Sequence, residues 1–294
     1  MPDLSDPAVF NAYVAAGAMA VACAILSVFV VARRWAFMGE GISHSGFGGA
    51  GTAWMLAVAF PSLNNERLPY ILVFIACMIA ALAVGWLVLS GRVASDTAIG
   101  IFLVASLAWG FIGQHIYVEH YGYQPFGFDN LLFGQMKSIS STYTRIACCV
   151  AGGVAVCTWG LWKELIAYAF DPLLARTGGV RAAGIHYLLL LLIALTIVIG
   201  IRVVGTVLVT ALLVLPAVTA NLLTGRLSHV MTLSIAAGLI GAWGGLLINQ
   251  QFRAVPAGSA IVLTLVVLFL IVLAGTSLRR VIMKSAGPSP SGEG

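Results

Sequence analysis

The chain has 294 residues, of which 61% are hydrophobic and only 9% are charged, and its mean hydropathy is +1.03. Soluble globular domains carry roughly 25% charged residues, so the composition excludes an ordinary water-soluble fold. Apolar runs long enough to cross about 30 Å of hydrocarbon recur along nearly the whole chain. Because these runs do not alternate in polarity, they predict membrane-spanning helices and not a β-barrel.

The net charge of +5 is better explained by basic cytoplasmic loops than by nucleic-acid binding, so we expect no nucleic-acid partner. The five cysteines lie in apolar runs without a CxxC pair, which is typical of small buried side chains. The N-terminal segment has no basic n-region and carries Asp3 and Asp6. We therefore expect the first apolar run to remain as a helix and not to be a cleaved signal peptide.

Taken in chain order, the apolar runs predict an all-α, polytopic membrane helical bundle of about nine transmembrane helices in one domain, residues 1–284. The predicted helices lie near 10–32, 40–60, 69–89, 97–117, 142–160, 183–200, 204–224, 229–249 and 257–279. Ten of the 15 Lys and Arg residues fall on one set of loops, which predicts an N-terminus outside and a C-terminus inside. Residues 285–294 are predicted to form a disordered cytoplasmic tail.

Small residues and one proline mark how the helices pack. The segments Gly46–Gly51 and Gly238–Gly245 carry glycines at helix-packing spacings, which allow close approach in lipid. Pro216 is expected to kink the seventh helix. These features predict a tightly packed bundle and indicate nothing about a substrate.

A polar stretch between Gln114 and Ser141 follows the fourth predicted helix on the outer side. Its candidate metal-binding side chains are His115, Glu119, His120 and Asp129. Two interpretations are open, namely an outer-face relay that guides an ion and a solvated polar loop.

A second polar stretch, between Trp162 and Gly184, lies on the inner side and contains FDPLLARTGG. Asp171 suits an N-cap, Pro172 suits the first helical position, and Gly178–Gly179 can close a helix. We therefore expect a short cytoplasmic helix of about two turns. Such a helix could dock against another protein or merely link two spans.

The segment RRWAFMGEGISHSGFGGAG holds two candidate metal ligands, Glu40 and His44. Their four-residue spacing puts both side chains on one face of a helix that continues into an apolar run. Ionisable groups there are costly unless they face a cavity, pair or bind an ion. A carboxylate with an imidazole suits Zn²⁺, Mn²⁺ or Fe²⁺, and a two-fold dimer would bring together four ligands. Alternatively, Glu40 is an exposed carboxylate favoured by the helix dipole, with His44 its i+4 partner.

Five segments in order resemble the ABC-3 family of metal permeases, the membrane subunits of bacterial zinc, manganese and iron ABC importers. They are VARRWAFMGEGISHS, SDTAIGIF, LLFGQ, FDPLLARTGG and IRVVGTVLVTALLVLPAVTANLL, and they span most of the chain. The resemblance implies a fold similar to vitamin B12-type importer permeases and a place in the bacterial cytoplasmic (inner) membrane. It implies three kinds of partner, namely ABC ATPase subunits, a second identical or related permease chain, and an extracytoplasmic metal-binding protein.

The resemblance also implies roles for particular residues. It places the metal-conducting pair of the family on Glu40 and His44, where relatives usually carry aspartate in place of Glu40. Glutamate keeps the charge but reaches one methylene further, which leaves the preferred metal open. His186, at the start of the sixth helix, is expected to be interfacial. The segment implied to couple to the ATPase consists of Phe170, Asp171, Pro172, Leu173, Leu174, Ala175 and Arg176.

No G-x-x-x-x-G-K-[ST] motif occurs, so we expect a transport subunit and not an enzyme, with ATP hydrolysis on separate subunits. We expect no permanently bound cofactor, only transported Zn²⁺, Mn²⁺ or Fe²⁺. One alternative is a same-fold importer for a siderophore or cobalamin, whose pathway would not need Glu40 and His44. A secondary transporter would show an inverted repeat, and an intramembrane protease would show G-x-S-x-G or H-E-x-x-H. None of these is present in the sequence.

Overall fold

A computed structural model describes residues 7–65, 67–125, 140–171, 175, 177–252 and 255–285. Within these residues the chain forms helices and no strands, which confirms the predicted all-α class. The helices are α1 (Pro7–Ala32), α2 (Met38–Ala59), the 3-10 turn η1 (Pro61–Leu63), α3 (Leu68–Leu89), α4 (Ser95–Tyr121), α6 (Ser141–Gly160), α7 (Trp162–Phe170), α9 (Ala182–Val204), α10 (Thr206–Leu212), α11 (Leu215–Leu223), α12 (Leu227–Gln251) and α13 (Ala257–Ser285). The predicted tail, apart from Ser285, lies outside the described residues.

Seven described segments are long and apolar enough to cross a membrane, namely α1, α3, α4, α9, Thr206–Leu223, α12 and α13. A bent pair, α6 and α7, would add an eighth. Helix α2 has 22 residues but is rich in glycine and serine, and most of its side chains are buried in the protein. Each of the nine ranges predicted from the sequence coincides with described helical structure.

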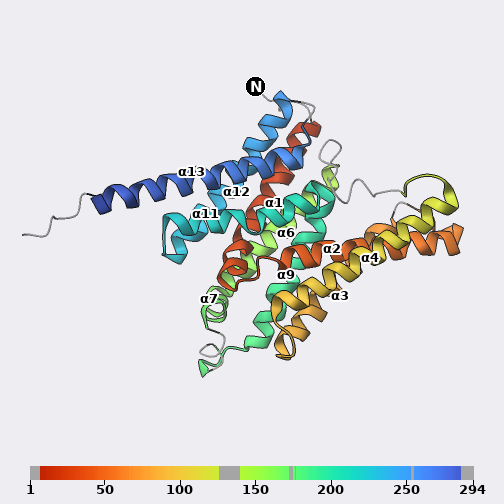
Figure 1. The fold of residues 1–294 in the computed structure, drawn as a ribbon, viewed down its shortest axis with the longest axis horizontal. Helices are drawn as coiled ribbons and strands as arrows, with labels where there is room; N and C mark the ends of the chain where they lie inside the picture. Colours follow the sequence, from red (N-terminus) through yellow and green to blue (C-terminus); the bar gives the residue numbers. More distant parts are fainter. Residues whose placement is uncertain are drawn as a thin grey trace, which may run out of the picture.

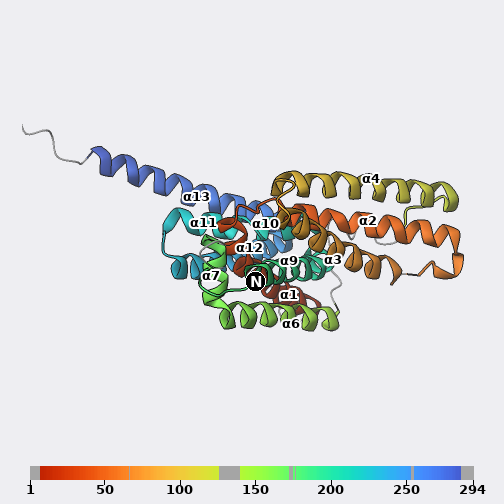
Figure 2. The ribbon, with the colours of Figure 1, turned by 90° about the horizontal axis from the view of Figure 1, so that it is seen from below.

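The helices divide into a core and a lateral lobe. Helices α2, α3 and α4 lie side by side in the lobe, and α1 lies in the core against α6, α9 and α12 (Figures 1 and 2). Helix α13 packs on α12 through its first half, where Ala260, Ile261 and Leu265 are buried, and its second half extends away from the bundle (Figure 1). The candidate site lies where the lobe meets the core.

Glycine sets the distance between α2 and α4. A methyl group added at Gly51 would stand 2.7 Å from the Cα atom of Gly110, and one added at Gly41 would stand 2.6 Å from the Ile99 side chain. The two helix backbones can be this close only because these positions have no side chain. The contact fixes the position of α2, which carries Glu40 and His44.

The seventh predicted helix is broken near Pro216, as expected. Helix α10 ends at Leu212 and α11 begins at Leu215, with Pro216 in its first turn. Proline cannot donate a hydrogen bond to the carbonyl of Leu212, four residues earlier, and its ring crowds that carbonyl. A second break, at Gly205, separates α10 from α9. Gly205 has φ +88°, a conformation that side chains disfavour, so α10 can turn back toward α2.

The fourth predicted helix extends four residues further than the hydropathy indicates. It ends at Tyr121, where Gly122 has φ +76° and donates a backbone hydrogen bond of 2.8 Å to Val118. The rings of Tyr117 and Tyr121 pack with their centroids 4.7 Å apart, which stabilises this last turn. The first part of the predicted outer polar stretch is therefore helical.

The inner polar stretch also begins with a helix that the sequence analysis did not predict. Helices α6 and α7 meet at Leu161 with a bend of 78°. Leu165, Tyr168 and Ala169 are buried on the inner face of α7, which explains why a segment with Lys163 and Glu164 folds against the bundle.

Candidate functional site

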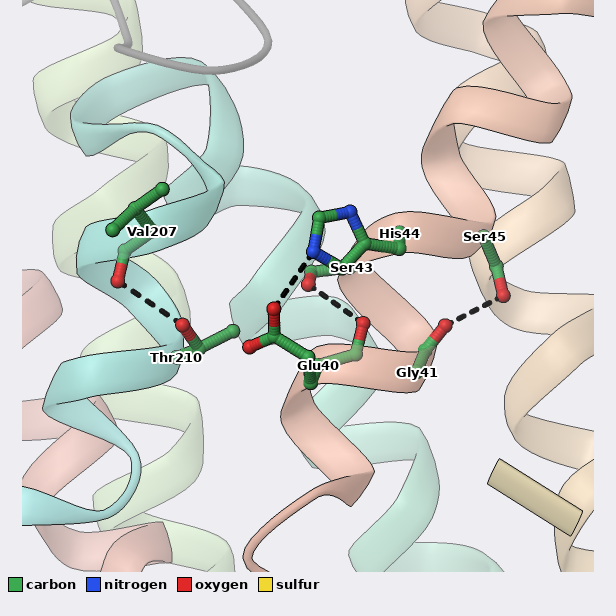
Figure 3. Close-up of polar contacts among 7 residues, drawn as sticks. All are labelled: Glu40, Gly41, Ser43, His44, Ser45, Val207 and Thr210. Atoms are coloured by element: carbon green, nitrogen blue, oxygen red, sulfur yellow. Dashed lines mark hydrogen bonds and ion pairs between the residues drawn. The ribbon is translucent and has the colours of Figure 1, made fainter. Parts of the chain in front are cut away.

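Glu40 and His44 lie one turn apart at the start of α2 and contact each other directly (Figure 3). Glu40 Oε1 is 2.7 Å from His44 Nε2, and the two side chains are 38% and 18% exposed. The turn that precedes them closes α1, with Arg34 at φ +58° and Trp35 donating its N–H to the carbonyl of Val30 at 2.8 Å. The predicted pair is thus assembled by local structure, in a position that an ion can reach.

The neighbouring hydroxyl groups are engaged with the backbone (Figure 3). Ser43 donates to the carbonyl of Glu40 at 2.9 Å, and Ser45 donates to the carbonyl of Gly41 at 2.7 Å. Thr210 on α10 faces the carboxylate of Glu40, while its hydroxyl donates to the carbonyl of Val207 at 3.0 Å. The side chains of Glu40 and His44, together with that of Thr210, therefore line the space between α2 and α10.

The imidazole of His44 is held by packing. Its ring stacks on Phe47 with centroids 5.8 Å apart and planes 28° apart. Nδ1 is buried without a hydrogen-bond partner in the described structure, whereas Nε2 faces Glu40. Nε2 is therefore the nitrogen that can bind an ion together with Glu40. If each ligand atom lies about 2.1 Å from an ion and the ligand–ion–ligand angle is about 90°, the two ligand atoms are about 3.0 Å apart. The 2.7 Å distance between Oε1 and Nε2 would therefore need to increase only slightly.

One chain supplies only part of a coordination shell. The described residues contain no group of three or more His, Cys, Asp or Glu side chains placed to hold a metal ion. A site with two protein ligands would bind a divalent metal weakly unless water or a second chain completed the shell. The two-fold arrangement, in which each chain would contribute one Glu and one His, stays a prediction.

The predicted outer residues lie on the last two turns of α4. His115, Glu119 and His120 are all exposed there, and the ring of His120 rests edge-on against Tyr121 at 4.7 Å. They do not form a described metal-binding group with one another or with Glu40 and His44. Asp129 lies outside the described residues. The relay therefore stays a prediction.

The expected coupling segment is described only at Phe170, Asp171 and Ala175. Phe170 ends α7 and is 66% exposed. Ala175 donates its N–H to the carbonyl of Asp171 at 3.0 Å, and Val180 donates to the carbonyl of Ala175 at 3.0 Å next to Gly179 at φ +82°. These bonds match the predicted start and glycine closure of a short helix. Pro172, Leu173, Leu174 and Arg176 lie outside the described residues.

A buried aromatic cluster lies beside this segment and was missed by sequence reasoning. His186 is 1% exposed, and its Nδ1 lies 2.6 Å from the hydroxyl of Tyr168 on α7. The edge of the Trp35 ring meets the imidazole at 5.2 Å, and the guanidinium of Arg33 lies 4.6 Å from the centroid of Tyr168. The sequence places His186 at an interface, whereas it is buried in the protein. Nothing in the local pattern pairs it with a tyrosine 18 residues away.

Comparison with known families gives one match over nearly the whole chain. The model of the ABC 3 transport family matches residues 5–276. A Halalkalibacterium halodurans protein described as the manganese transport system membrane protein MntC is 33% identical over 261 residues, which cover 88% of this chain and 84% of the relative. A Haemophilus influenzae protein described as a probable iron transport system membrane protein is 30% identical, covering 92% of this chain and 94% of the relative.

Solved structures share the fold of this chain. A structure described as PsaBC from Streptococcus pneumoniae in complex with Fab matches with a TM-score of 0.75 and 30% identity, covering 92% of each chain. An ABC transporter assigned to the metal-chelate type, in an inward-facing conformation, matches with a TM-score of 0.71. Its identity is 14%, so it supports the fold alone.

Proposed function

The chain belongs to the ABC 3 transport family, and from this premise we propose that it is the membrane-spanning permease subunit of an ABC importer for divalent transition metal ions. The observation that carries the proposal is the Glu40–His44 pair, with 2.7 Å between Oε1 and Nε2, facing α10. The relatives named for manganese and iron favour Mn²⁺ or Fe²⁺ as the substrate, with Zn²⁺ as the competitor to be tested.

The pair suits transient binding of an ion in transit. An arriving ion would take the place of the hydrogen bond between Glu40 and His44 and form one bond to each. Because a single chain offers one carboxylate and one imidazole, binding would be firm only when a second chain adds its own pair. A site in a transport pathway must accept an ion and then release it. A shell divided between two chains meets both requirements, since separating the chains weakens it.

The remaining parts of the chain fit the partners of such an importer. ATPase subunits would dock on the cytoplasmic surface around Phe170 and Asp171, and an extracytoplasmic binding protein would deliver the ion at the opposite face. The excess of Lys and Arg on the loops next to that cytoplasmic surface supports an N-terminus outside and a C-terminus inside. The membrane would be the cytoplasmic membrane of a bacterium.

The proposal is tested by metal accumulation in cells that carry the complete transporter and are starved in turn of manganese, iron and zinc. We expect Glu40→Gln and His44→Gln each to reduce uptake of the same metal by about tenfold or more, because losing one ligand bond costs over about 1.4 kcal/mol. Each variant must reach the membrane at the level of the unmodified chain.

Glu164→Gln and His229→Gln are the matched controls, since they remove the same two side-chain types away from α2. Uptake should be unchanged in both. If Glu40→Gln and His44→Gln leave uptake of all three metals intact, the pair is not the pathway, and an importer of a chelated metal or other organic substrate becomes the better interpretation.

A further inference from the structure

Arg202, in the last turn of α9, is held between two aromatic rings. Its guanidinium carbon lies 3.8 Å from the ring centroid of Tyr70 on α3 and 4.0 Å from that of Tyr143 on α6. Its Nε is buried without a hydrogen-bond partner in the described structure. The two rings fix the position of the guanidinium and supply part of its electrostatic stabilisation, but they offer no strong hydrogen-bond acceptor. Arg202 is also part of the wall of a cavity.

The cavity has a volume of about 620 Å³ and lies between α3, α6 and α9. Arg67 and Arg202 supply its positive charges, and none of the described residues that line it is Asp or Glu. The rest of its wall is largely apolar, and Ile71, Phe74 and Ile146 remain exposed on the surface of the bundle. The cavity therefore combines two guanidinium groups with an open apolar groove.

Its position along the helices indicates the depth at which the charges lie. Arg67 immediately precedes α3, Tyr143 is in the first turn of α6, and Arg202 is in the last turn of α9. The three helices thus end at the same level. Arginine and tyrosine at the ends of membrane helices lie near the lipid headgroups, and the groove lined by Ile71, Phe74 and Ile146 continues from there toward the hydrocarbon.

We propose that this cavity binds one anionic phospholipid, with its headgroup phosphate between Arg67 and Arg202 and its acyl chains in the groove. Guanidinium groups bind phosphate oxygens through paired, charge-assisted hydrogen bonds. Acyl chains fill an apolar groove that opens to the bilayer, whereas an acidic segment of a protein partner would leave that groove uncovered. The proposal requires only that the chain spans a membrane and is independent of the substrate that it transports.

The test is lipid retention by the purified transporter after reconstitution in a mixture of phosphatidylglycerol and phosphatidylethanolamine, measured by native mass spectrometry during delipidation. We expect phosphatidylglycerol to be retained in preference to phosphatidylethanolamine, and Arg202→Gln to lower this retention by about tenfold. Arg67→Gln, at the exposed rim, should lower it in the same direction without disturbing the core. Arg226→Gln, at the start of α12 and outside the cavity, is the control and should retain lipid as the unmodified chain does.

Two results would overturn the proposal. One is equal retention of phosphatidylglycerol by the unmodified chain, Arg202→Gln and Arg67→Gln. The other is a response to inorganic phosphate alone: if excess phosphate removes the bound lipid and also raises the thermal stability of the delipidated protein, the cavity recognises the free anion. Retention that depends on both arginines and resists phosphate supports a phospholipid site.

Discussion

Glu40 reaches one methylene further than the aspartate that the family resemblance leads one to expect at this position. In the structure this extra length closes the 2.7 Å contact between Oε1 and Nε2 of His44 across one helical turn. An aspartate on the same backbone would withdraw its oxygens by about one carbon–carbon bond, ~1.5 Å. The glutamate therefore matters for how tightly the two ligands of one chain can hold an ion together.

Glu40→Asp is expected to raise the half-saturating metal concentration for uptake by about tenfold and to leave the maximal rate within about twofold. The carboxylate remains, so the chemistry of transfer is preserved, but its distance to Nε2 of His44 becomes too long for both to bind one ion without movement of α2. Concentration-dependent uptake of Mn²⁺, Fe²⁺ and Zn²⁺ separates the two parameters. A fall in maximal rate at unchanged half-saturation would contradict this account.

The pair was predictable from the sequence because its geometry is local. A spacing of four residues puts Glu40 and His44 on one face of any helix, whatever the rest of the fold. The position of Thr210 opposite the carboxylate depends on the breaks at Gly205 and Pro216 and on the packing of α10 against α2. Such long-range contacts have no signature in a hydropathy pattern, so the far wall of the site was not predicted.

At the scale of whole helices, the α2–α4 contact offers a direct test of close packing. Gly51→Ala would place a methyl group 2.7 Å from the Cα atom of Gly110, where only backbone movement can relieve the clash. We expect a loss of about 1–3 kcal/mol, the usual cost of overpacking a core. Thermal unfolding in detergent should show a lower midpoint temperature, and uptake should fall because α2 carries the proposed metal ligands.

Gly100→Ala on α4 is the matched control. A methyl group there meets no atom within 4 Å, so the same substitution keeps the packing and gains up to about 1 kcal/mol of helix propensity. Its unfolding midpoint should be equal to or above that of the unmodified chain. If Gly51→Ala is as stable as Gly100→Ala, the two helices are not in close contact in the membrane.

Apolar length made most helices predictable, whereas their ends and bends were not. The observed bounds of α3 differ from the predicted ones by one residue. Both the apolar run and the membrane span end where the chain leaves the hydrocarbon, so the run predicts the ends of the helix well. Helix α7 follows a 78° bend and is held by burial of Leu165 and Tyr168. Its partners come from other helices, so a polar-looking segment between two spans gave no indication of it.

At the scale of the whole molecule, the buried cluster around His186 lies between the proposed metal site and the expected coupling segment. Arg33 and Trp35 precede helix α2, which carries the proposed metal ligands, and Tyr168 lies three residues before Asp171 in the expected coupling segment. The 2.6 Å contact between the hydroxyl of Tyr168 and Nδ1 of His186 ties α7 to α9, while Trp35 packs on both of these rings and Arg33 packs on that of Tyr168. These contacts run from the turn before α2 to the helix before the expected coupling segment, and we predict that they contribute to coupling between the two.

Tyr168→Phe removes only the hydroxyl and keeps the ring under Arg33. A buried hydrogen bond contributes about 1 kcal/mol, so the chain should still fold, and ATP hydrolysis by the assembled importer should persist. We expect uptake to fall by about fivefold, so that more ATP is consumed for each ion. Tyr187→Phe is the matched control, because the ring of Tyr187, which is on α9 like His186, also lies against His186, with ring centroids 5.5 Å apart. A parallel loss of ATP hydrolysis and uptake would mean that the cluster only supports the fold, and unchanged values of both would remove it from the coupling path.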